Sequence, residues 1–309
     1  MNKTIGSTLL VAGTMIGAGM LAMPLTSAGI GFGFTLVLLL GLWALLTFSA
    51  LLFVELYQTA ESDAGIGTLA EQYFGKAGRI IATTVLIIFL YALIAAYISG
   101  GGSLLKDLLP ESFGDKVSIL LFTVIFGSFI VIGTHSVDKI NRVLFFVMLA
   151  AFAVVLSLML PEIKFDNLMA TPMDNALIIT AFGFHGSIPS LNKYLGGNVK
   201  ALRISILAGS AITLCAYILW QISTHGLLTQ NEFLQILKED ATLNGLVKAT
   251  LAITGSNMIA GAVKLFSTLA LVTSFLGVAL GLLECIEDLL KRSFNISAGR
   301  ISLGLMTFI

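Results

Sequence analysis

Charged residues are scarce in this chain. Of its 309 residues, only 11% are Asp, Glu, Lys or Arg, and 57% are hydrophobic. Soluble domains carry about 25% charged residues, and the mean hydropathy here is +0.99. This composition excludes a soluble globular domain and indicates a membrane protein that is surrounded by a lipid bilayer. The few basic residues form no patch, so we expect no nucleic-acid partner.

Cysteine is also rare, and the familiar catalytic motifs are missing. The two cysteines, Cys215 and Cys285, have no metal-ligand spacing. We interpret them as small apolar side chains rather than as a disulfide or a metal pair. No HExxH, GxSxG or P-loop pattern occurs in the sequence. The sequence therefore predicts a protein that is not an enzyme and that holds no metal or cofactor.

Long stretches without charge are what the chain has in abundance. About 20 apolar residues cross a bilayer as a helix, and bulky aliphatic residues without two-residue alternation favour helices over a β-barrel. We expect an all-α polytopic membrane protein with eight spans and the start of a ninth, at residues 5–27, 34–56, 80–105, 118–133, 143–160, 175–191, 202–223, 265–286 and from 301. The short, more polar stretch 249–263 is predicted to be part of a loop.

The distribution of Lys and Arg predicts the orientation. If the N-terminus is cytoplasmic, the inner loops and helix ends carry eleven of the 17 basic residues and the outer side carries six. Cytoplasmic loops of membrane proteins carry an excess of basic residues. We therefore expect a multi-pass protein with a cytoplasmic N-terminus.

The first span is interrupted by glycines. Backbone that unwinds in a bilayer survives only where it lines a cavity or is buried in protein. A helix that resumes after such a break presents a positive N-terminal end, which binds carboxylates. We therefore predict substrate binding at Gly13, Thr14, Gly17, Ala18 and Gly19. The alternative is that the glycines at 13 and 17 form only a packing seam between helices.

The sixth span contains a second interruption. Phe182, Gly183 and Phe184 combine flexible backbone with two aromatic rings, which could wall a ring-bearing substrate. His185 follows them at membrane depth, where an ionisable side chain is costly and usually functional. It is a candidate substrate contact or proton carrier; the equal alternative is a neutral histidine that is hydrogen-bonded to a neighbouring helix. Pro189 indicates a helix that resumes with a kink.

Weaker candidates lie in two other spans. Tyr91 and Tyr97 in the third span could place one hydroxyl in the cavity, or both could be ordinary packing. Ser274 in the eighth span could line the pathway. Gly277 and Gly281 beside it are equally typical of a helix contact.

Four blocks of sequence resemble a known family. Residues 12–24 (AGTMIGAGMLAMP) are similar to the first-helix signature of the hydroxy and aromatic amino acid permeases. The blocks at 91–100 (YALIAAYISG), 182–190 (FGFHGSIPS) and 273–281 (TSFLGVALG) resemble the third, sixth and eighth spans of that family. The tyrosine-specific members are the most similar, and the first and sixth spans carry the most specific motifs.

The resemblance implies a fold and a function. The fold is that of the amino acid, polyamine and organocation carriers, with LeuT-type inverted five-helix repeats. Residues 1–160 would form the first repeat and residues 161–309 part of the second. The function is proton-coupled import of tyrosine in a bacterial inner membrane, with the amino acid and the proton as partners. Family members have eleven spans, whereas this chain stops early in the ninth, and its stretch 172–182 looks shorter than theirs.

The two breaks together predict a mechanism of alternating access. The substrate carboxylate would meet the N–H groups around Gly17, Ala18 and Gly19. Its ammonium would meet the carbonyls near Phe182 and Gly183, and its ring a pocket that includes the second phenylalanine of that block. Helices one, two, six and seven would rock against the others. The alternatives are a tryptophan or other amino acid carrier, or a truncated membrane protein that does not transport.

Overall fold

The structure is a computed structural model that describes residues 3–62, 64–106, 109–110, 113–171, 185–239, 243–293 and 295–308. These residues are almost all helical. The elements are α1 (Lys3–Met15), α2 (Ala18–Ser27), η1 (Ala28–Ile30), α3 (Gly31–Leu56), α4 (Ile66–Lys106), α5 (Asp115–Ile132), α6 (Thr134–Met159), η2 (Leu160–Glu162), α7 (Phe165–Leu168), η3 (His185–Ser187), α8 (Ile188–Tyr194), α9 (Val199–Leu227), α10 (Gln230–Glu239), α11 (Leu243–Thr254), α12 (Asn257–Ser293) and α13 (Arg300–Phe308).

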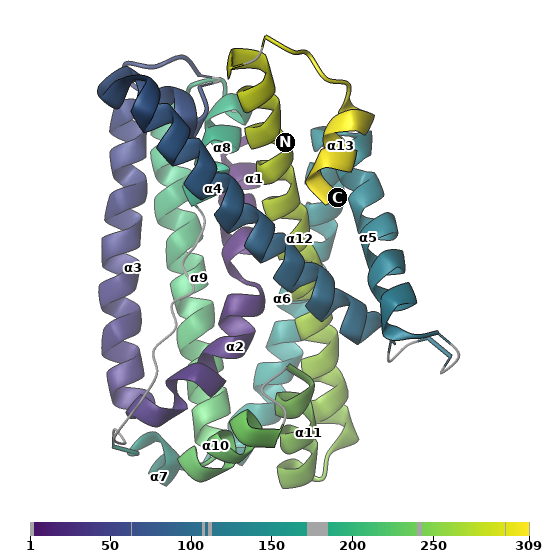
Figure 1. Ribbon diagram of the computed structural model, residues 1–309. Coiled ribbons are helices and arrows are strands. Elements are labelled where there is room, and N and C mark those ends of the chain that lie inside the picture. Colours follow the sequence, from purple (N-terminus) through teal and green to yellow (C-terminus); the bar gives the residue numbers. More distant parts are fainter. Residues whose placement is uncertain are drawn as a thin grey trace.

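Long helices form the body of the molecule. In Figure 1, α3, α6, α9 and α12 run between the upper and lower ends, and α4 crosses them obliquely. We call the end that carries α8 and α13 the upper end, and the end that carries α7, α10 and α11 the lower end. The helix α12 is central: 83% of its most apolar stretch is buried, against 22% to 50% in the other membrane-length helices of the described residues.

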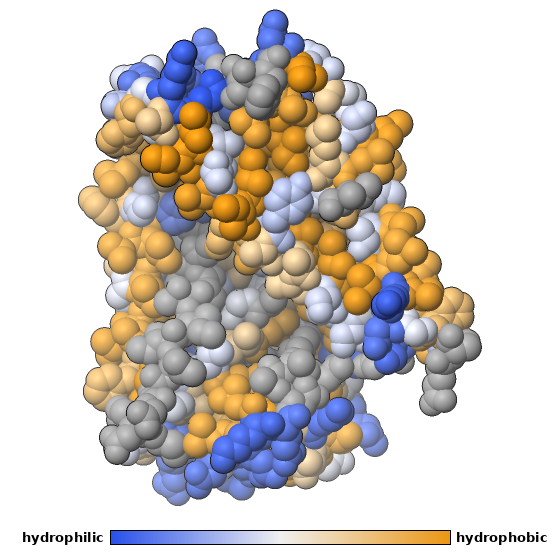
Figure 2. All heavy atoms as spheres, in the orientation of Figure 1, coloured by the Kyte–Doolittle hydropathy of each residue, from blue (hydrophilic) through white to orange (hydrophobic). Residues whose placement is uncertain are grey.

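The outer surface suits a lipid environment. Figure 2 shows hydrophobic side chains over the middle of the visible face and hydrophilic ones gathered at its upper and lower ends. Large apolar side chains are exposed on successive turns of the long helices, including Val37, Leu45, Phe48, Ile81, Val85, Ile88, Leu120, Val124 and Phe146. In water such a belt would be a large exposed apolar patch. In a bilayer it faces lipid, and the protein is therefore a multi-pass membrane protein.

Most of the expected spans are confirmed as helices. Six continuous helices of the described chain are long and apolar enough to cross a membrane. The expected first span is split into α1 and α2, of 13 and 10 residues. Neither helix alone is long enough to count among these six. The sixth span lies largely in residues 172–184, outside the described residues, and the ninth begins as α13.

One element was predicted wrongly. The stretch 249–263, expected in a loop, is instead helical on both sides of a short break: α11 ends at Thr254, Gly255 has φ +62°, and α12 begins at Asn257. A helix can begin outside the bilayer, so a shortage of apolar residues does not exclude one there. The same holds for α4, which begins at Ile66 and kinks at Gly75 (φ +65°) before the expected span.

Close packing of α1 against α9 depends on Gly209. A Cβ atom placed there would lie 2.6 Å from Cγ1 of Val11 and 2.9 Å from the backbone oxygen of Thr8. We expect Gly209→Ala to lower the free energy of unfolding by about 1–3 kcal/mol, as overpacking usually does. Thermal unfolding in detergent measures this. The control is Gly41→Ala on exposed α3, where a Cβ meets nothing within 4 Å; equal melting temperatures for the two variants would contradict the assignment.

Candidate functional site

The predicted interruption of the first span is present. The helix α1 ends at Met15, and α2 begins at Ala18 after Gly17, whose φ and ψ are −151° and −150°. The last N–H bond of α1 joins Ile16 to the carbonyl of Ala12 at 2.9 Å. The ladder then stops, so carbonyls at the end of α1 and N–H groups at the start of α2 need other partners. Both sets meet in the middle of the bundle (Figure 1).

Two hydroxyl groups from other helices satisfy the carbonyl side of the break. The buried Tyr217 of α9 donates its OH to the carbonyl of Met15 at 2.6 Å. The hydroxyl of Ser274 on α12 lies 3.3 Å from each of three carbonyl oxygens of the first span, those of Gly13, Thr14 and Ile16. One hydroxyl has one proton to donate, so three acceptors share a single donor. Such a converging set of carbonyls is suited to a group with several N–H donors.

The backbone N–H groups on the other side of the break belong to the start of α2. Gly17 stands in the N-cap position of α2, so the N-cap residue has no side chain to cap the first turn. The N-terminal N–H groups and the helix dipole together make a favourable place for a carboxylate. Gly17 is buried, whereas Gly19 is exposed, so the start of α2 is reachable from outside the core. The break thus has N–H donors on the α2 side, and on the α1 side it has carbonyls that Tyr217 and Ser274 contact.

The glycines also serve packing, as the alternative interpretation held. A Cβ at Gly13 would lie 3.1 Å from the Phe145 ring of α6. The hydroxyl of Thr14 bonds to the carbonyl of Leu10 in its own helix, and its side chain sits 2.7 Å from the ideal Cβ of Gly277. Gly13 and Thr14 therefore pack against α6 and α12 through their side-chain faces. Only their backbone carbonyls belong to the break.

The two candidate tyrosines of α4 have different surroundings. Tyr97 is buried in a hydrophobic cluster that includes Phe275, the neighbour of Ser274 on α12. Tyr91 donates to the carbonyl of Met306 in α13. The structure therefore packs Tyr97 against the helix that carries Ser274 and leaves Tyr91 on another face of α4.

The second predicted interruption lies mostly beyond the described part of the chain. Phe182, Gly183 and Phe184 fall in residues 172–184, as does the stretch predicted to be short. His185 begins η3; it bonds to the backbone of Leu46 and lies edge-on to the Phe53 ring with centroids 6.1 Å apart. The helix α8 then resumes at Ile188 with proline in its first turn, as the sequence predicted.

The polar groups at the break are suited to hydrogen bonding with a bound molecule. Among the described residues, no group of three or more His, Cys, Asp or Glu side chains could hold a metal ion. The groups that meet at the break are backbone carbonyls, backbone N–H groups and hydroxyls. Sequence reasoning missed Tyr217, because it stands apart from any glycine motif. The only feature of the sequence that pointed to Tyr217 was a tyrosine hydroxyl within the uncharged apolar span 202–223.

The contact made by Tyr217 can be tested directly. Tyr217→Phe removes the donor to Met15 while keeping the ring. We expect the apparent affinity for substrate to fall about fivefold, which corresponds to the roughly 1 kcal/mol net value of one hydrogen bond. Concentration dependence of uptake gives the number. Tyr91→Phe is the matched control, since its hydroxyl serves α13; an equal effect in both variants would show that neither hydroxyl acts through the break.

Comparison with known proteins decides the family. The whole chain, residues 1–309, matches the tryptophan/tyrosine permease family. The chain belongs to this family. The resemblance found in the four sequence blocks is thereby confirmed, and the protein is a membrane permease by descent rather than a member of an enzyme family.

Two relatives from Haemophilus influenzae are closely similar. Tyrosine-specific transport system 1 is 92% identical over 316 residues, which cover 100% of the chain and 79% of the relative. Tyrosine-specific transport system 2 is 56% identical over 321 residues, with 100% of the chain and 79% of the relative covered. Both relatives are named as transport systems.

A solved structure shows the same fold. The nucleobase-cation-symport-1 family transporter Mhp1, in a closed conformation with bromovinylhydantoin bound, has a TM-score of 0.67. The match covers 98% of the chain and 70% of Mhp1 at 14% identity, which is evidence for the fold alone. The LeuT-type fold expected from the resemblance is therefore confirmed.

Proposed function

We propose that this permease imports an aromatic amino acid together with a proton, and that tyrosine is its substrate. The observation that carries the proposal is the 92% identity with a relative named as tyrosine-specific. The break between α1 and α2 also supports it, because the two-residue gap leaves N–H groups at the start of α2 that suit a carboxylate. The ammonium of a zwitterion needs carbonyl oxygens as its partners.

The binding mode follows from these partners. The substrate carboxylate lies at the N–H groups of Gly17, Ala18 and Gly19. The ammonium lies at carbonyls of the second interruption, near Phe182 and Gly183. The ring occupies a pocket that Phe184 helps to form, with Thr14, Tyr97, His185 and Ser274 around the site.

Transport then proceeds by alternating access in the inner membrane. Residues 1–160 form the first repeat, and residues 161–309 belong to the second. The upper end, which carries the start of α1 and α8, faces the cytoplasm because more basic residues lie at that end. The helices α1, α2, α3, α8 and α9 rock against the remaining ones and expose the site to each side in turn.

Uptake of radiolabelled tyrosine into proteoliposomes tests the proposal. We expect uptake to be saturable, to rise when the outside is made acidic, and to be inhibited by excess unlabelled tyrosine more strongly than by tryptophan. Preference for tryptophan or another amino acid would replace tyrosine as substrate. No uptake and no exchange under any gradient would favour the alternative of a membrane protein that does not transport.

A further inference from the structure

A second polar cavity lies at the upper end, apart from the break. It is a recess of about 720 Å³, mouth included, between the beginning of α4, the helix α8 and the last turns of α12. Carboxyl groups gather along it from α12, with lysines beside them: Glu284, Glu287, Asp288, Lys193 and Lys291. Ionisable residues in a membrane-spanning helix are costly and mark functional sites. The recess therefore needs an explanation that the substrate site does not give.

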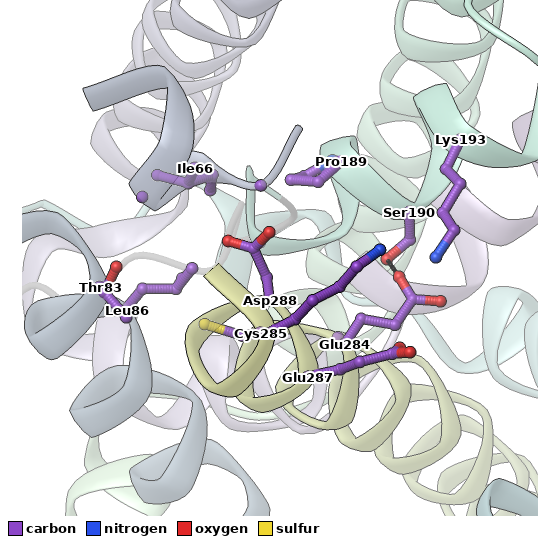
Figure 3. Close-up of a pocket in the computed structure, with 15 residues that line it drawn as sticks. Ile66, Thr83, Leu86, Pro189, Ser190, Lys193, Glu284, Cys285, Glu287 and Asp288 are labelled. Atoms are coloured by element: carbon purple, nitrogen blue, oxygen red, sulfur yellow. Dashed lines mark hydrogen bonds between the residues drawn. The ribbon is translucent and has the colours of Figure 1, made fainter. Parts of the chain in front are cut away.

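One hydrogen bond crosses this recess. The hydroxyl of Ser190 on α8 donates to the carboxylate of Glu284 on α12. Figure 3 shows the two side chains pointing toward each other, joined by a dashed line. The helix α8 begins at Ile188, just after the predicted second interruption, and α12 is the central buried helix. This bond therefore ties α8 to the middle of the bundle.

The same face of α12 reaches the break in the first span. Ser274, Gly277, Gly281 and Glu284 recur at three- or four-residue spacing and so share one face of the helix. Ser274 contacts the carbonyls of the first span, Gly277 packs on Thr14, and a Cβ atom placed at Gly281 would lie 3.6 Å from the carbonyl of Gly186. The ten steps along the helix from Ser274 to Glu284 span about 15 Å. A continuous line of contacts thus runs from the candidate substrate site to the recess.

The contacts of the upper end divide into two kinds under the proposed rocking motion. Some join helices that move together, such as the ion pair of Glu55 on α3 with Arg203 on α9 at 2.5 Å. Others join the moving group to the static group. These include the bond from Ser190 to Glu284 and the bond from Arg142 on α6 to Tyr194 on α8 at 2.9 Å. Opening of the upper end separates pairs of the second kind.

The two cross-group bonds respond differently to protons. An arginine keeps its charge at all physiological pH values. A carboxyl group, by contrast, exchanges protons in an accessible range. A hydrogen bond to an ionised carboxylate is about twice as strong as one between neutral groups. Protonation of Glu284 therefore weakens the tie between α8 and α12, whereas the tie of Arg142 to Tyr194 stays as it is.

His185, the candidate found from sequence, contacts Leu46 and Phe53, and both belong to α3. Since α3 and α8 move together in the proposed motion, these contacts are kept in both states. The carboxylate of Glu284 instead accepts a hydrogen bond across the boundary between the two groups.

We propose that Glu284 is the group that binds the coupling proton, and that its protonation releases α8 from α12. This inference rests on the proposed function. The carboxylate takes up one proton that comes from the outer side while the upper end is closed, and it loses this proton to the cytoplasm once that end is open. When it is ionised again, it accepts the Ser190 hydrogen bond and closes the upper end.

Several charged groups face Glu284 and define its field. Lys193 from α8 and Arg300 from α13 attract the ionised form, and Glu287 on its own helix repels it. Asp288, one turn further, accepts a bond from Thr68 of α4 at 3.4 Å. Carboxylates thus crowd this end of α12. Burial, and in addition the charge of Asp288, raise the pKa of Tyr57 at the end of α3 above its ordinary value.

Glu284→Gln tests the inference in proteoliposomes, with two measurements on the same preparation. A pH gradient of one unit sustains at most about tenfold accumulation for one proton per substrate. We expect the wild type to accumulate tyrosine toward that limit, and Glu284→Gln to stop at a ratio of about one. Exchange of internal for external tyrosine without a gradient should persist in the variant. Glu287→Gln, an exposed carboxylate on the same helix, should accumulate like the wild type.

Each other outcome decides against a specific claim. Normal accumulation by Glu284→Gln would overturn the proton role. Loss of exchange together with accumulation would also overturn it, because the residue would then be needed for binding or folding. If Glu287→Gln lost accumulation to the same extent, the cause would be the net negative charge of the recess rather than Glu284 in particular. Absence of exchange in the wild type would instead remove the proposed function on which the inference depends.

Discussion

Gly17→Val is expected to abolish tyrosine uptake while leaving the protein folded in the membrane. A Cβ at Gly17 would lie 2.0 Å from Oγ and 2.7 Å from Cβ of Ser274. Rotating the serine hydroxyl relieves only the first contact, so α1 and α12 would have to move apart at the break. The N–H groups at the start of α2 would move with them. Losing two charge-assisted hydrogen bonds of about 1.5 kcal/mol each corresponds to a roughly 100-fold loss of affinity.

Two measurements separate loss of binding from loss of folding. Size-exclusion chromatography in detergent should give the same symmetric peak for Gly17→Val and the wild type. Gly33→Val on α3 is the control, since a Cβ there meets nothing within 4 Å; it should transport normally. Uptake by Gly17→Val within a few-fold of the wild type would remove the break from the substrate site.

Much of the fold was accessible from sequence because a bilayer imposes simple rules. Backbone polar groups must be satisfied within each span, so a long uncharged stretch has to be helical. The start of α12 at Asn257 was missed because that rule says nothing about the polar extension of a helix beyond the lipid. Gly75 and Gly255 mark where helices bend or stop, with φ of +65° and +62°. Neither position lies in an expected span, so neither was examined as a helix boundary.

The candidate site could be predicted only in part from sequence. The parts that were predicted depend on neighbouring residues, and the parts that were missed depend on residues far apart in the chain. The glycine pattern around Gly17 is local, so the break in the first span was predicted correctly. The partner of Met15 lies 202 residues away at Tyr217, and Ser190 and Glu284 are 94 residues apart. Nothing in the local sequence pairs these residues. Only the packing of α1 on α9, and the approach of α8 to α12, brings them together.

Ser274→Ala is expected to produce the second large effect. The serine hydroxyl is fully buried and is shared by three carbonyl oxygens of the first span. Its removal leaves these acceptors without that donor in a place that water does not reach. A buried polar group that loses its partner costs about 1–3 kcal/mol. We expect the free energy of unfolding to fall by about 2 kcal/mol, and the apparent affinity for substrate to fall by up to about 30-fold.

The control for this variant is on the same helix. Ser267 is equally buried, and its hydroxyl has no hydrogen-bond partner among the described residues. Removing an unsatisfied hydroxyl is neutral or slightly favourable, so Ser267→Ala should match the wild type in both melting temperature and uptake. Ser274→Ala should match it in neither. If the two variants behave alike, the hydroxyl on α12 does not stabilise the carbonyls at the end of α1. The hydrogen bond from Tyr217 of α9 would then be the one that stabilises them.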